Sequence, residues 1–498
     1  MATPLPDIQP TATAVRDGTN YRGAFAIMTS LFFLWGFMTV FNDILIPRFK
    51  AAFTLDYFRA MLVQFAFFGA YFVGALAYFI VSMVKGDPIA RIGYKNGVVL
   101  GLLISATGSA LFWPAAALSS YPLFLGALFV VGLGFALLQI AANPYVTILG
   151  PERTASSRLN LAQGFNSLGT TTGPLIGGFL IFEYFAKTGA HGADSVKMPY
   201  LGFCIVFLLL AAIFFFIRLP HIGEGHAENG AGALQYPHVK LGILAIFAYV
   251  GGEVAVGSAI ISFLALPDVA ALTEVEASKY VAIYWGGLMI GRFMGAVELG
   301  EMPRRIKQTL LVVIPVVAFL FLWAAKSSPI DFLQNHSSGE FFALWGRQFQ
   351  DNWSVFRNYL PFIGLCWLLF QFGKALAGRT LTIFALTVVV LLATAILAGG
   401  KLALWCVVAV GLFSSIGWSN TFSLAIEGVG IHKSQASSLL VMAILGGAIL
   451  PPVQGYMADR VGLQVSFLIP LFAYAYVAFY GAIGHRVGRK NLARESAL

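Results

Sequence analysis

Apolar runs long enough to cross a lipid bilayer follow one another along almost the whole chain. A membrane-spanning helix needs about 20 consecutive apolar residues. Six such runs lie in the first half, near 24–46, 62–84, 97–116, 121–146, 161–184 and 199–218. Eight more lie near 241–266, 279–298, 307–324, 358–373, 380–397, 403–426, 436–457 and 464–484. Because lipid offers the backbone no hydrogen bonds, we expect an all-α polytopic membrane protein of about 14 spans.

The composition agrees with a chain that lives in a bilayer. Of its 498 residues 58% are hydrophobic and only 11% are charged, whereas soluble domains carry about 25% charged residues. The net charge of +9 comes from Lys and Arg in short segments between the apolar runs. This placement is a topology signal under the positive-inside rule, and we expect no nucleic-acid partner. The three cysteines lie in apolar runs without ligand spacing, so neither a disulfide nor a metal site is predicted.

A polar stretch near 218–240, rich in Gly, His and Glu, divides the apolar runs into two sets. We expect a cytoplasmic segment 1–22, a six-helix half 23–218, a cytoplasmic linker 219–240, a second half 241–485 and a cytoplasmic tail 486–498. The short run at 358–373 could be re-entrant instead of spanning. Basic residues near both termini place both on the cytoplasmic side of the cell (inner) membrane, and an even number of spans then favours a crossing.

The two halves share a spacing of Gly and Pro. A Gly, a Pro five residues later and a Gly three residues after that occur in both, as Gly169, Pro174 and Gly177 and again as Gly447, Pro452 and Gly455. Repeated halves with a substrate site at their interface are a common plan of transporters. The spacing therefore favours a transporter with an internal repeat.

Several motifs resemble one transporter family. "GDPIARIGYK" has Gly86, Arg91, Gly93 and Lys95 at the spacing of the major facilitator loop signature, with Ala90 where the signature has an aspartate. "FFLWGFMTVFNDILIPRF", "AANPYVTILGPE", "RLNLAQGFNSLGTTTGP", "YVGGEVAVGS", "GRFMGA" and "FSLAIEGVG" then occur in this order. Over 32–482 the chain thus resembles the fucose–galactose–glucose proton symporter family of the major facilitator superfamily.

The resemblance implies a major facilitator fold of two six-helix halves that moves a monosaccharide by alternating access. It does not cover the segment between the eighth run and Leu404, which adds a helix pair between about 300 and 400 to the twelve helices typical of the family. Which of the three apolar runs there is the family's ninth helix stays open. The pair has no acid or base in its apolar stretches, so we expect it to pack peripherally, with its connection 326–357 on the outer face.

Two acids, Asp43 and Glu253, lie well inside apolar runs. A charged side chain at this depth costs about 2.5–3.5 kcal/mol on insertion scales, so it normally faces a cavity or a partner. All seven histidines fall in loops or at run ends. Carboxylates are therefore the candidates for proton coupling.

Asp43 shares a helix face with Trp35, Thr39 and Asn42, within roughly 100° of arc. This polar and aromatic stripe suits a sugar and favours a functional aspartate. The alternative is an aspartate near the outer end of the first helix that pairs with Arg48 or Arg59.

The resemblance adds that the family's first-helix aspartate, matched by Asp43, takes part in proton coupling. Gln139 stands where the family's fucose permease has a second acid, and Glu253 stands where that permease has an amide. The second acid has thus changed halves, and by resemblance this favours the glucose and galactose branch.

Amide side chains are the natural sugar ligands, because they form many hydrogen bonds and cost less to desolvate than charges. Gln139 and Asn143 share one helix face, and Gln163, Asn166 and Thr170 share another. The alternative is that these amides join membrane helices to one another.

In the second half, Tyr249 shares a face with Glu253, and Trp418 lies beside Asn420, so we include Tyr249, Trp418 and Asn420 among the sugar-binding candidates. Arg292 is the base inside a run, and we expect it to close an inner gate or cap a helix by pairing with an acid. Arg91 of the loop motif is the other gating candidate.

These features predict a proton-coupled monosaccharide symporter rather than an enzyme. The chain has no HExxH motif and no histidine cluster within a run. We expect no cofactor beyond the proton gradient, with sodium as an alternative coupling ion, and a monomer whose partners are the sugar and the lipid bilayer. Export of drugs or other amphiphiles by the same fold is the competing function, and the amide stripes argue against it.

Overall fold

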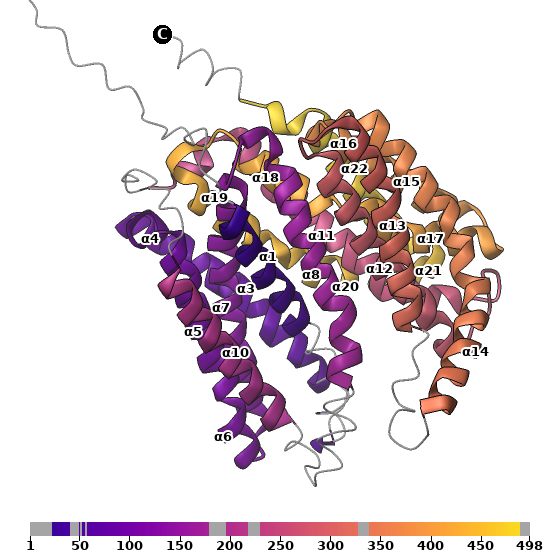
Figure 1. Ribbon diagram of the computed structural model, residues 1–498, viewed down its shortest axis with the longest axis horizontal. Coiled ribbons are helices and arrows are strands. Elements are labelled where there is room, and N and C mark those ends of the chain that lie inside the picture. The colour runs from indigo at the N-terminus through magenta and orange to yellow at the C-terminus, as the bar shows by residue number, and fades with distance from the viewer. Residues whose placement is uncertain are drawn as a thin grey trace, which may run out of the picture.

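The computed structural model describes residues 22–39, 49, 52–54, 57–178, 196–217, 230–326 and 338–488. Long helices dominate these residues and run side by side as a bundle (Figure 1). The candidate residues Asn42 and Asp43 lie outside the described part of the chain.

The first half supplies the helices drawn in indigo to magenta (Figure 1). They are α1 (Arg22–Thr39), α3 (Tyr57–Lys85), the short α4 (Pro88–Ile92), α5 (Tyr94–Ala110), α6 (Phe112–Ala117), α7 (Tyr121–Ile148), α8 (Ala155–Gly178) and α10 (Lys197–Phe216).

The second half is longer. It contains α11 (Pro237–Leu264), α12 (Glu274–Glu298), α13 (Arg304–Lys326), α14 (Ser338–Phe356), α15 (Leu360–Gly373), α16 (Ala377–Leu397), α17 (Gly400–Ser414), α18 (Gly417–Ile426), α19 (Lys433–Met442), α20 (Gly446–Val461), α21 (Leu463–Ser466) and α22 (Leu468–Ala482).

Within the described residues, 12 helical stretches are long and apolar enough to cross a membrane. Five of them combine consecutive helices, namely Tyr94–Ala117, Phe342–Gly373, Gly400–Ile426, Gly430–Val461 and Leu463–Arg486. The apolar helix Gly23–Thr39 is shorter, and α8 supplies a further helix of the bundle. The prediction of an all-helical membrane protein with about 14 spans is therefore confirmed.

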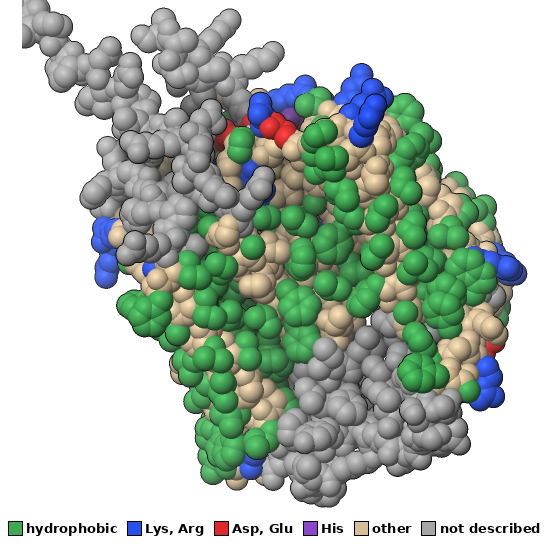
Figure 2. Space-filling view, in the orientation of Figure 1, with side chains coloured by type: hydrophobic (Ala, Val, Ile, Leu, Met, Phe, Trp, Pro, Cys, Tyr) green, Lys and Arg blue, Asp and Glu red, His purple; other side chains and the backbone are tan. Residues whose placement is uncertain are grey.

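The outside of the bundle is apolar where lipid would surround it. Leu209, Phe216, Val390 and Leu397 are among the exposed apolar side chains. In Figure 2 such side chains cover the middle of the visible face, and Lys and Arg gather mainly near its upper edge and its right side. A surface of this kind needs a bilayer to cover it.

The internal repeat is visible in how the helices pair. α1 packs along α8, and α11 packs along α20 in the same way. A Cβ on Gly169 would lie 2.2 Å from the Phe33 carbonyl oxygen, and one on Gly446 would lie 2.0 Å from the Phe247 carbonyl oxygen. Close backbone approach at these crossings requires glycine, although in the second half the closest contact falls on Gly446 rather than on Gly447 of the predicted repeat.

The packing of the helices identifies the family's ninth helix, which the sequence alone did not distinguish from its neighbours. In the first half α5 packs against α7 and α10, and in the second half α16 packs in the same manner against α17 and α22. The third helix of the second repeat is therefore α16. The additional pair consists of α13, which packs on α12, and the broken helix α14–α15, which lies at the right-hand side of the bundle in Figure 1.

The predicted connection 326–357 is largely helical, because α14 covers Ser338–Phe356. Its aromatic side chains recur at helical spacing and pack on α13: the Phe349 ring stacks on Trp323 at 3.5 Å between centroids, and Trp353 lies 4.7 Å from the same ring. The sequence analysis missed this helix because its other face is polar, so no apolar run marks it.

Candidate functional site

A carboxylate lies among tyrosines in the second half. The Tyr249 hydroxyl donates to Oε2 of Glu253, one turn along α11, as the predicted shared face requires. The Tyr284 hydroxyl of α12 donates to the Glu253 carbonyl oxygen at 2.8 Å. Tyr474 of α22 meets the Tyr249 ring edge-on, with centroids 6.3 Å apart. Among the described residues, the Glu253 carboxylate makes no ion pair within 4.0 Å.

Arg292 joins the two halves. Its Nη1 donates to the Ser167 hydroxyl of α8 at 2.6 Å, and its Nε donates to the Ser415 carbonyl oxygen at 3.3 Å. The acid partner predicted for Arg292 is thus replaced by a hydroxyl and a carbonyl in the described structure. Glu253 is still close enough to interact with it electrostatically.

In the first half, a second polar cluster spans three helices. The Trp35 indole nitrogen donates to the Tyr71 hydroxyl at 3.0 Å, and the Gln139 side chain contacts the same hydroxyl. The cluster thus connects α1, α3 and α7. Trp35 and Gln139, predicted separately as sugar ligands, are brought together by Tyr71, which sequence reasoning missed because a single tyrosine in an aromatic-rich helix carries no signal.

Three buried amides in α7 and α8 have hydrogen-bonding capacity to spare. Gln139 Oε1 and both amide atoms of Asn143 are buried without a partner in the described structure. Gln163 is 5% exposed and makes no hydrogen bond to a described residue. A stranded buried polar group costs about 1–3 kcal/mol, so such groups are suited to receive a ligand.

Asn166 and Thr170 are used differently. Asn166 Nδ2 donates to the Phe32 carbonyl oxygen of α1 at 3.1 Å, and the Thr170 hydroxyl donates to the Ser167 carbonyl oxygen at 2.9 Å. The helix-joining alternative therefore describes Asn166, although it lies on the face predicted for Gln163.

The second-half candidates Trp418 and Asn420 also differ in their hydrogen-bond partners. Asn420 is fully buried; its Oδ1 accepts from Asn160 of α8 at 2.9 Å and its Nδ2 donates to the Ala377 carbonyl oxygen at 3.1 Å. This amide is occupied by a contact between the halves, and its role as a sugar ligand stays a prediction from the sequence. The Trp418 ring stacks on Phe422, and its indole nitrogen is buried without a partner in the described structure.

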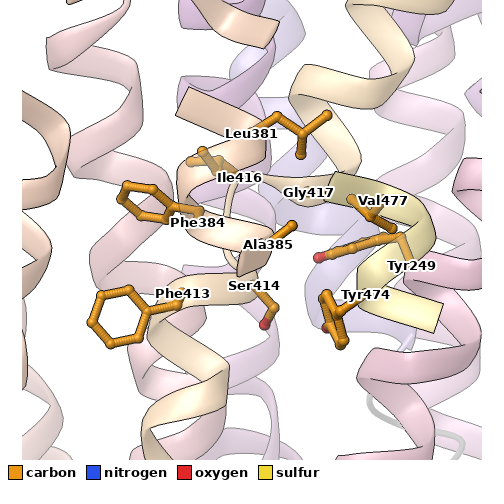
Figure 3. Close-up of a pocket in the computed structure, with 10 residues that line it drawn as sticks. All are labelled: Tyr249, Leu381, Phe384, Ala385, Phe413, Ser414, Ile416, Gly417, Tyr474 and Val477. Atoms are coloured by element: carbon orange, nitrogen blue, oxygen red, sulfur yellow. The ribbon is translucent and has the colours of Figure 1, made fainter. Parts of the chain in front are cut away.

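A small cavity lies beside Tyr249 (Figure 3). Its volume is about 10 Å³, and Ser414, Tyr474 and mainly apolar side chains of α16, α17 and α22 line it. That volume holds about one water molecule, so it is too small for a sugar. Among the described residues, no three His, Cys, Asp or Glu side chains gather as metal ligands would.

A buried carboxylate ties the halves together at one end of the bundle. Asp87 is 2% exposed, and its Oδ1 accepts hydrogen bonds from the Tyr78 hydroxyl and, at 2.9 Å, from the Ile89 backbone nitrogen at the start of α4. Its Oδ2 accepts from the Ser434 hydroxyl of α19 in the second half. The Asp-Pro pair in the sequence signals only the cap of α4 and not the contact with Ser434.

Further contacts between the halves gather around Asp87, and we call this region the Asp87 end. Gln435 Nε2 donates to the Ser82 hydroxyl at 3.1 Å, and Ser157 Oγ donates to the Ala296 carbonyl oxygen at 2.5 Å. Arg153 Nη2 donates to Glu301 Oε2 at 2.7 Å. The halves are therefore closed against each other at this end.

Arg91, the gating candidate of the loop motif, makes no contact with the second half among the described residues. Arg91 is exposed, and its guanidinium donates to the Lys85 carbonyl oxygen within its own half. In the loop motif, the residue that crosses to the second half is Asp87. Sequence reasoning chose Arg91 because it matches the loop signature, whereas Asp87 stands at a position that the signature does not mark.

Comparisons with known proteins give a consistent set of relatives, although no family model matches. The chain is 40% identical to a glucose/galactose transporter of Brucella abortus, over 98% of this chain and 100% of that protein. It is 37% identical to a putative glucose/galactose transporter of Helicobacter pylori, over 93% and 97% of the two chains. It is 29% identical to the L-fucose-proton symporter of Escherichia coli, over 93% of each.

A solved structure is also similar. The crystal structure of the major facilitator transporter FucP in the outward conformation matches with a TM-score of 0.70 and 28% identity, over 93% of this chain and 99% of that chain.

Proposed function

Because the chain belongs to the fucose–galactose–glucose proton symporter family of the major facilitator superfamily, we propose that it takes up a monosaccharide together with a proton. Glucose and galactose are the first candidates, since the relatives named for them are 40% and 37% identical, and L-fucose follows at 29%. The relatives are transporters, which supports transport rather than an enzymatic reaction as the function of this chain.

The observation that carries proton coupling is the environment of Glu253. A carboxylate in a membrane helix without an ion pair among the described residues is costly to keep charged, which favours binding of a proton, while the Tyr249 hydroxyl and the nearby Arg292 hold its charged form when the proton leaves. Protonation removes a buried charge and lowers the cost of a closed, dehydrated state, and sugar binding favours the same closure. This shared preference links the two ligands. By resemblance, Asp43 is the second coupling acid.

For the sugar we propose a site between the halves. Gln139, Asn143 and Gln163 supply unused hydrogen-bonding groups, and Trp35 and Trp418 supply aromatic faces for the apolar side of a sugar ring. Asn42, one residue before Asp43, remains a candidate from the sequence. The number of neutral amides favours a sugar over an amphiphilic drug.

We propose further that the Asp87 end faces the cytoplasm and that the structure is outward-facing. Many Lys and Arg residues lie near this end, among them Lys85, Arg91, Lys95, Arg153, Lys240, Arg304, Arg305, Lys307, Lys374, Lys433 and Arg486. The positive-inside rule assigns such an end to the cytoplasm. With this orientation, we expect both ends of the chain in the cytoplasm. The outward conformation of the similar FucP structure supports the outward-facing state proposed for this chain.

This orientation predicts a labelling pattern. Asp268→Cys in the loop after α11 and Arg91→Cys after α3 place exposed thiols at opposite ends of the bundle. In intact cells, a membrane-impermeant thiol reagent is expected to label the first variant and spare the second, in a background with Cys204 replaced by Ser. The reverse pattern contradicts the proposed orientation.

The neighbouring amides Gln163 and Asn166 give a second test. Gln163→Ala is expected to raise the apparent dissociation constant of the sugar about tenfold, since one hydrogen bond that strands its partner is worth about 1–3 kcal/mol. Asn166→Ala, which removes the bond to the Phe32 carbonyl, is expected to lower thermal stability with less change in affinity. Equal effects of the two variants on affinity contradict this assignment.

The whole proposal is tested by uptake into proteoliposomes. Labelled glucose, galactose and L-fucose are offered with and without an imposed pH gradient, and with and without sodium. Accumulation that requires the pH gradient and ignores sodium is the expected result. Dependence on sodium alone identifies a sodium symporter, and outward movement of an amphiphilic dye without sugar uptake identifies an exporter.

A further inference from the structure

Both parts of the additional helix pair contact α12 at one glycine pair. A Cβ on Gly286 would lie 2.1 Å from a side-chain carbon of Leu322 in α13. A Cβ on Gly287 would lie 2.1 Å from the hydroxyl oxygen of Tyr359, which ends the short helix Arg357–Tyr359 just before α15. The glycine pair thus leaves the room that the added helices fill.

Tyr359 reaches into the second half. It is fully buried, its ring lies 6.4 Å from that of Trp405 in α17, and its hydroxyl lies close to the Leu412 backbone nitrogen. The added pair was predicted to pack peripherally, and most of it does. Tyr359 is the exception, because it occupies the space between α12 and α17.

The position of Tyr359 connects it with the carboxylate site. Gly287 is three residues from Tyr284, so both lie on the same face of α12. Tyr284 donates its hydroxyl to the Glu253 carbonyl oxygen at 2.8 Å. From the α17 side, a Cβ on Gly411 would lie 2.1 Å from the Tyr284 carbonyl oxygen. This turn of α12 is therefore held closely between Tyr359 and α17.

We propose that Tyr359 is a positioning residue for transport: it fixes the Gly287 turn of α12 and thereby holds Tyr284 against the Glu253 segment of α11. The proposal rests on the function proposed for Glu253. The titratable side chains around Glu253 in the described structure are Tyr249, Tyr284, Arg292 and Tyr474. None belongs to the added pair, so Tyr359 acts through the placement of α12 and not through its own charge.

The first test compares two aromatic residues of the same helix pair. Tyr359→Ala is expected to lower proton-driven accumulation about tenfold and to shift the pH of half-maximal uptake by about one unit. Trp353→Ala is the matched control, because Trp353 packs on Trp323 and Phe319 of α13. It is expected to leave the pH profile unchanged. Tyr359→Phe, which keeps the ring, is expected to restore accumulation to within about twofold of the unmodified protein.

A second pair of variants keeps the proposal testable if Tyr359→Ala fails to fold. Gly287→Ala places a methyl group against the Tyr359 hydroxyl and is expected to impair accumulation. Adding Tyr359→Phe removes the atom in closest contact. The double variant is therefore expected to accumulate at least about three times as much sugar as Gly287→Ala alone. No recovery in the double variant contradicts a direct contact between these positions in function.

Glu253→Gln serves as the reference for both tests. If Glu253→Gln changes the pH profile while Tyr359→Ala and Gly287→Ala leave it as in the unmodified protein, the positioning role is wrong and the proposed function stands. If Glu253→Gln itself keeps the normal pH profile, the coupling role of Glu253 is wrong. Equal losses of protein in Tyr359→Ala and Trp353→Ala, with no shift in pH profile, reduce Tyr359 to a folding role.

Discussion

Replacing Glu253 by Gln is expected to abolish accumulation of sugar against its gradient while exchange of sugar across the membrane continues. The amide oxygen still accepts the Tyr249 hydroxyl hydrogen, but the side chain no longer titrates. The ratio of internal to external sugar is therefore expected to fall to one in proteoliposomes with an imposed pH gradient. Counterflow of labelled sugar, which needs no proton gradient, measures the exchange that remains.

Asp268→Asn is the control for this experiment. Asp268 is an exposed acid in the loop after α11, so its replacement also removes one carboxylate but leaves the membrane helices unchanged. Accumulation is expected to be normal in this variant. Normal accumulation and normal pH dependence in Glu253→Gln, by contrast, would reduce Glu253 to a structural residue.

The fold was predictable because the bilayer imposes long apolar runs, and each run can be recognised in the sequence without knowledge of the others. The contact between Tyr249 and Glu253 was predictable for a similar reason, since residues four apart on a helix are neighbours. The ninth helix was not, because the apolar runs of the added region look alike in hydrophobicity. Only packing against α17 and α22 distinguishes α16 from the others.

The residue types of the candidate site were predictable from the sequence, but the role of each residue was less so. A polar side chain in a membrane helix must face a cavity or another helix, and both surroundings select the same residue types. Asn420 and Asn166 were therefore grouped with sugar ligands, although the first bonds to Asn160 and the second to the Phe32 carbonyl. Gln163 and Asn143 have the same chemistry and keep unused groups, a difference that only the neighbouring helices determine.

Contacts between distant parts of the chain carried no signal. Asp87 and Ser434 are separated by 347 residues, and neither stands out in its own segment. The contact of Tyr359 with Gly287 likewise depends on how the added pair enters the second half. These contacts join elements whose relative placement is decided by the packing of the whole bundle.

Replacing Asp87 by Ala is expected to reduce sugar uptake more than about tenfold by releasing the closed end of the bundle. The change removes the acceptor of the Tyr78 and Ser434 hydroxyls and the cap of α4. Each lost bond is worth about 1–3 kcal/mol when a buried partner is stranded, and a cap is worth about 1 kcal/mol. Only the Ser434 bond joins the halves, and a hydrogen bond to a charged group is worth about 1.5–3 kcal/mol, so the balance between the two conformations shifts roughly tenfold to a hundredfold away from the outward-facing state.

The change of conformation can be measured at Ser437, which is fully buried in α19 near the Asp87 end. A thiol reagent applied from the cytoplasmic side is expected to label Ser437→Cys slowly alone and rapidly when combined with Asp87→Ala. Arg91→Ala is the matched control from the same loop, because Arg91 bonds only within its own half among the described residues. It is expected to change neither the rate of sugar uptake nor the rate of thiol labelling strongly. If Arg91→Ala matches Asp87→Ala in both rates, the loop as a whole and not the carboxylate controls closure. If Asp87→Ala leaves uptake and labelling unchanged, the contact between Asp87 and Ser434 does not hold the halves together.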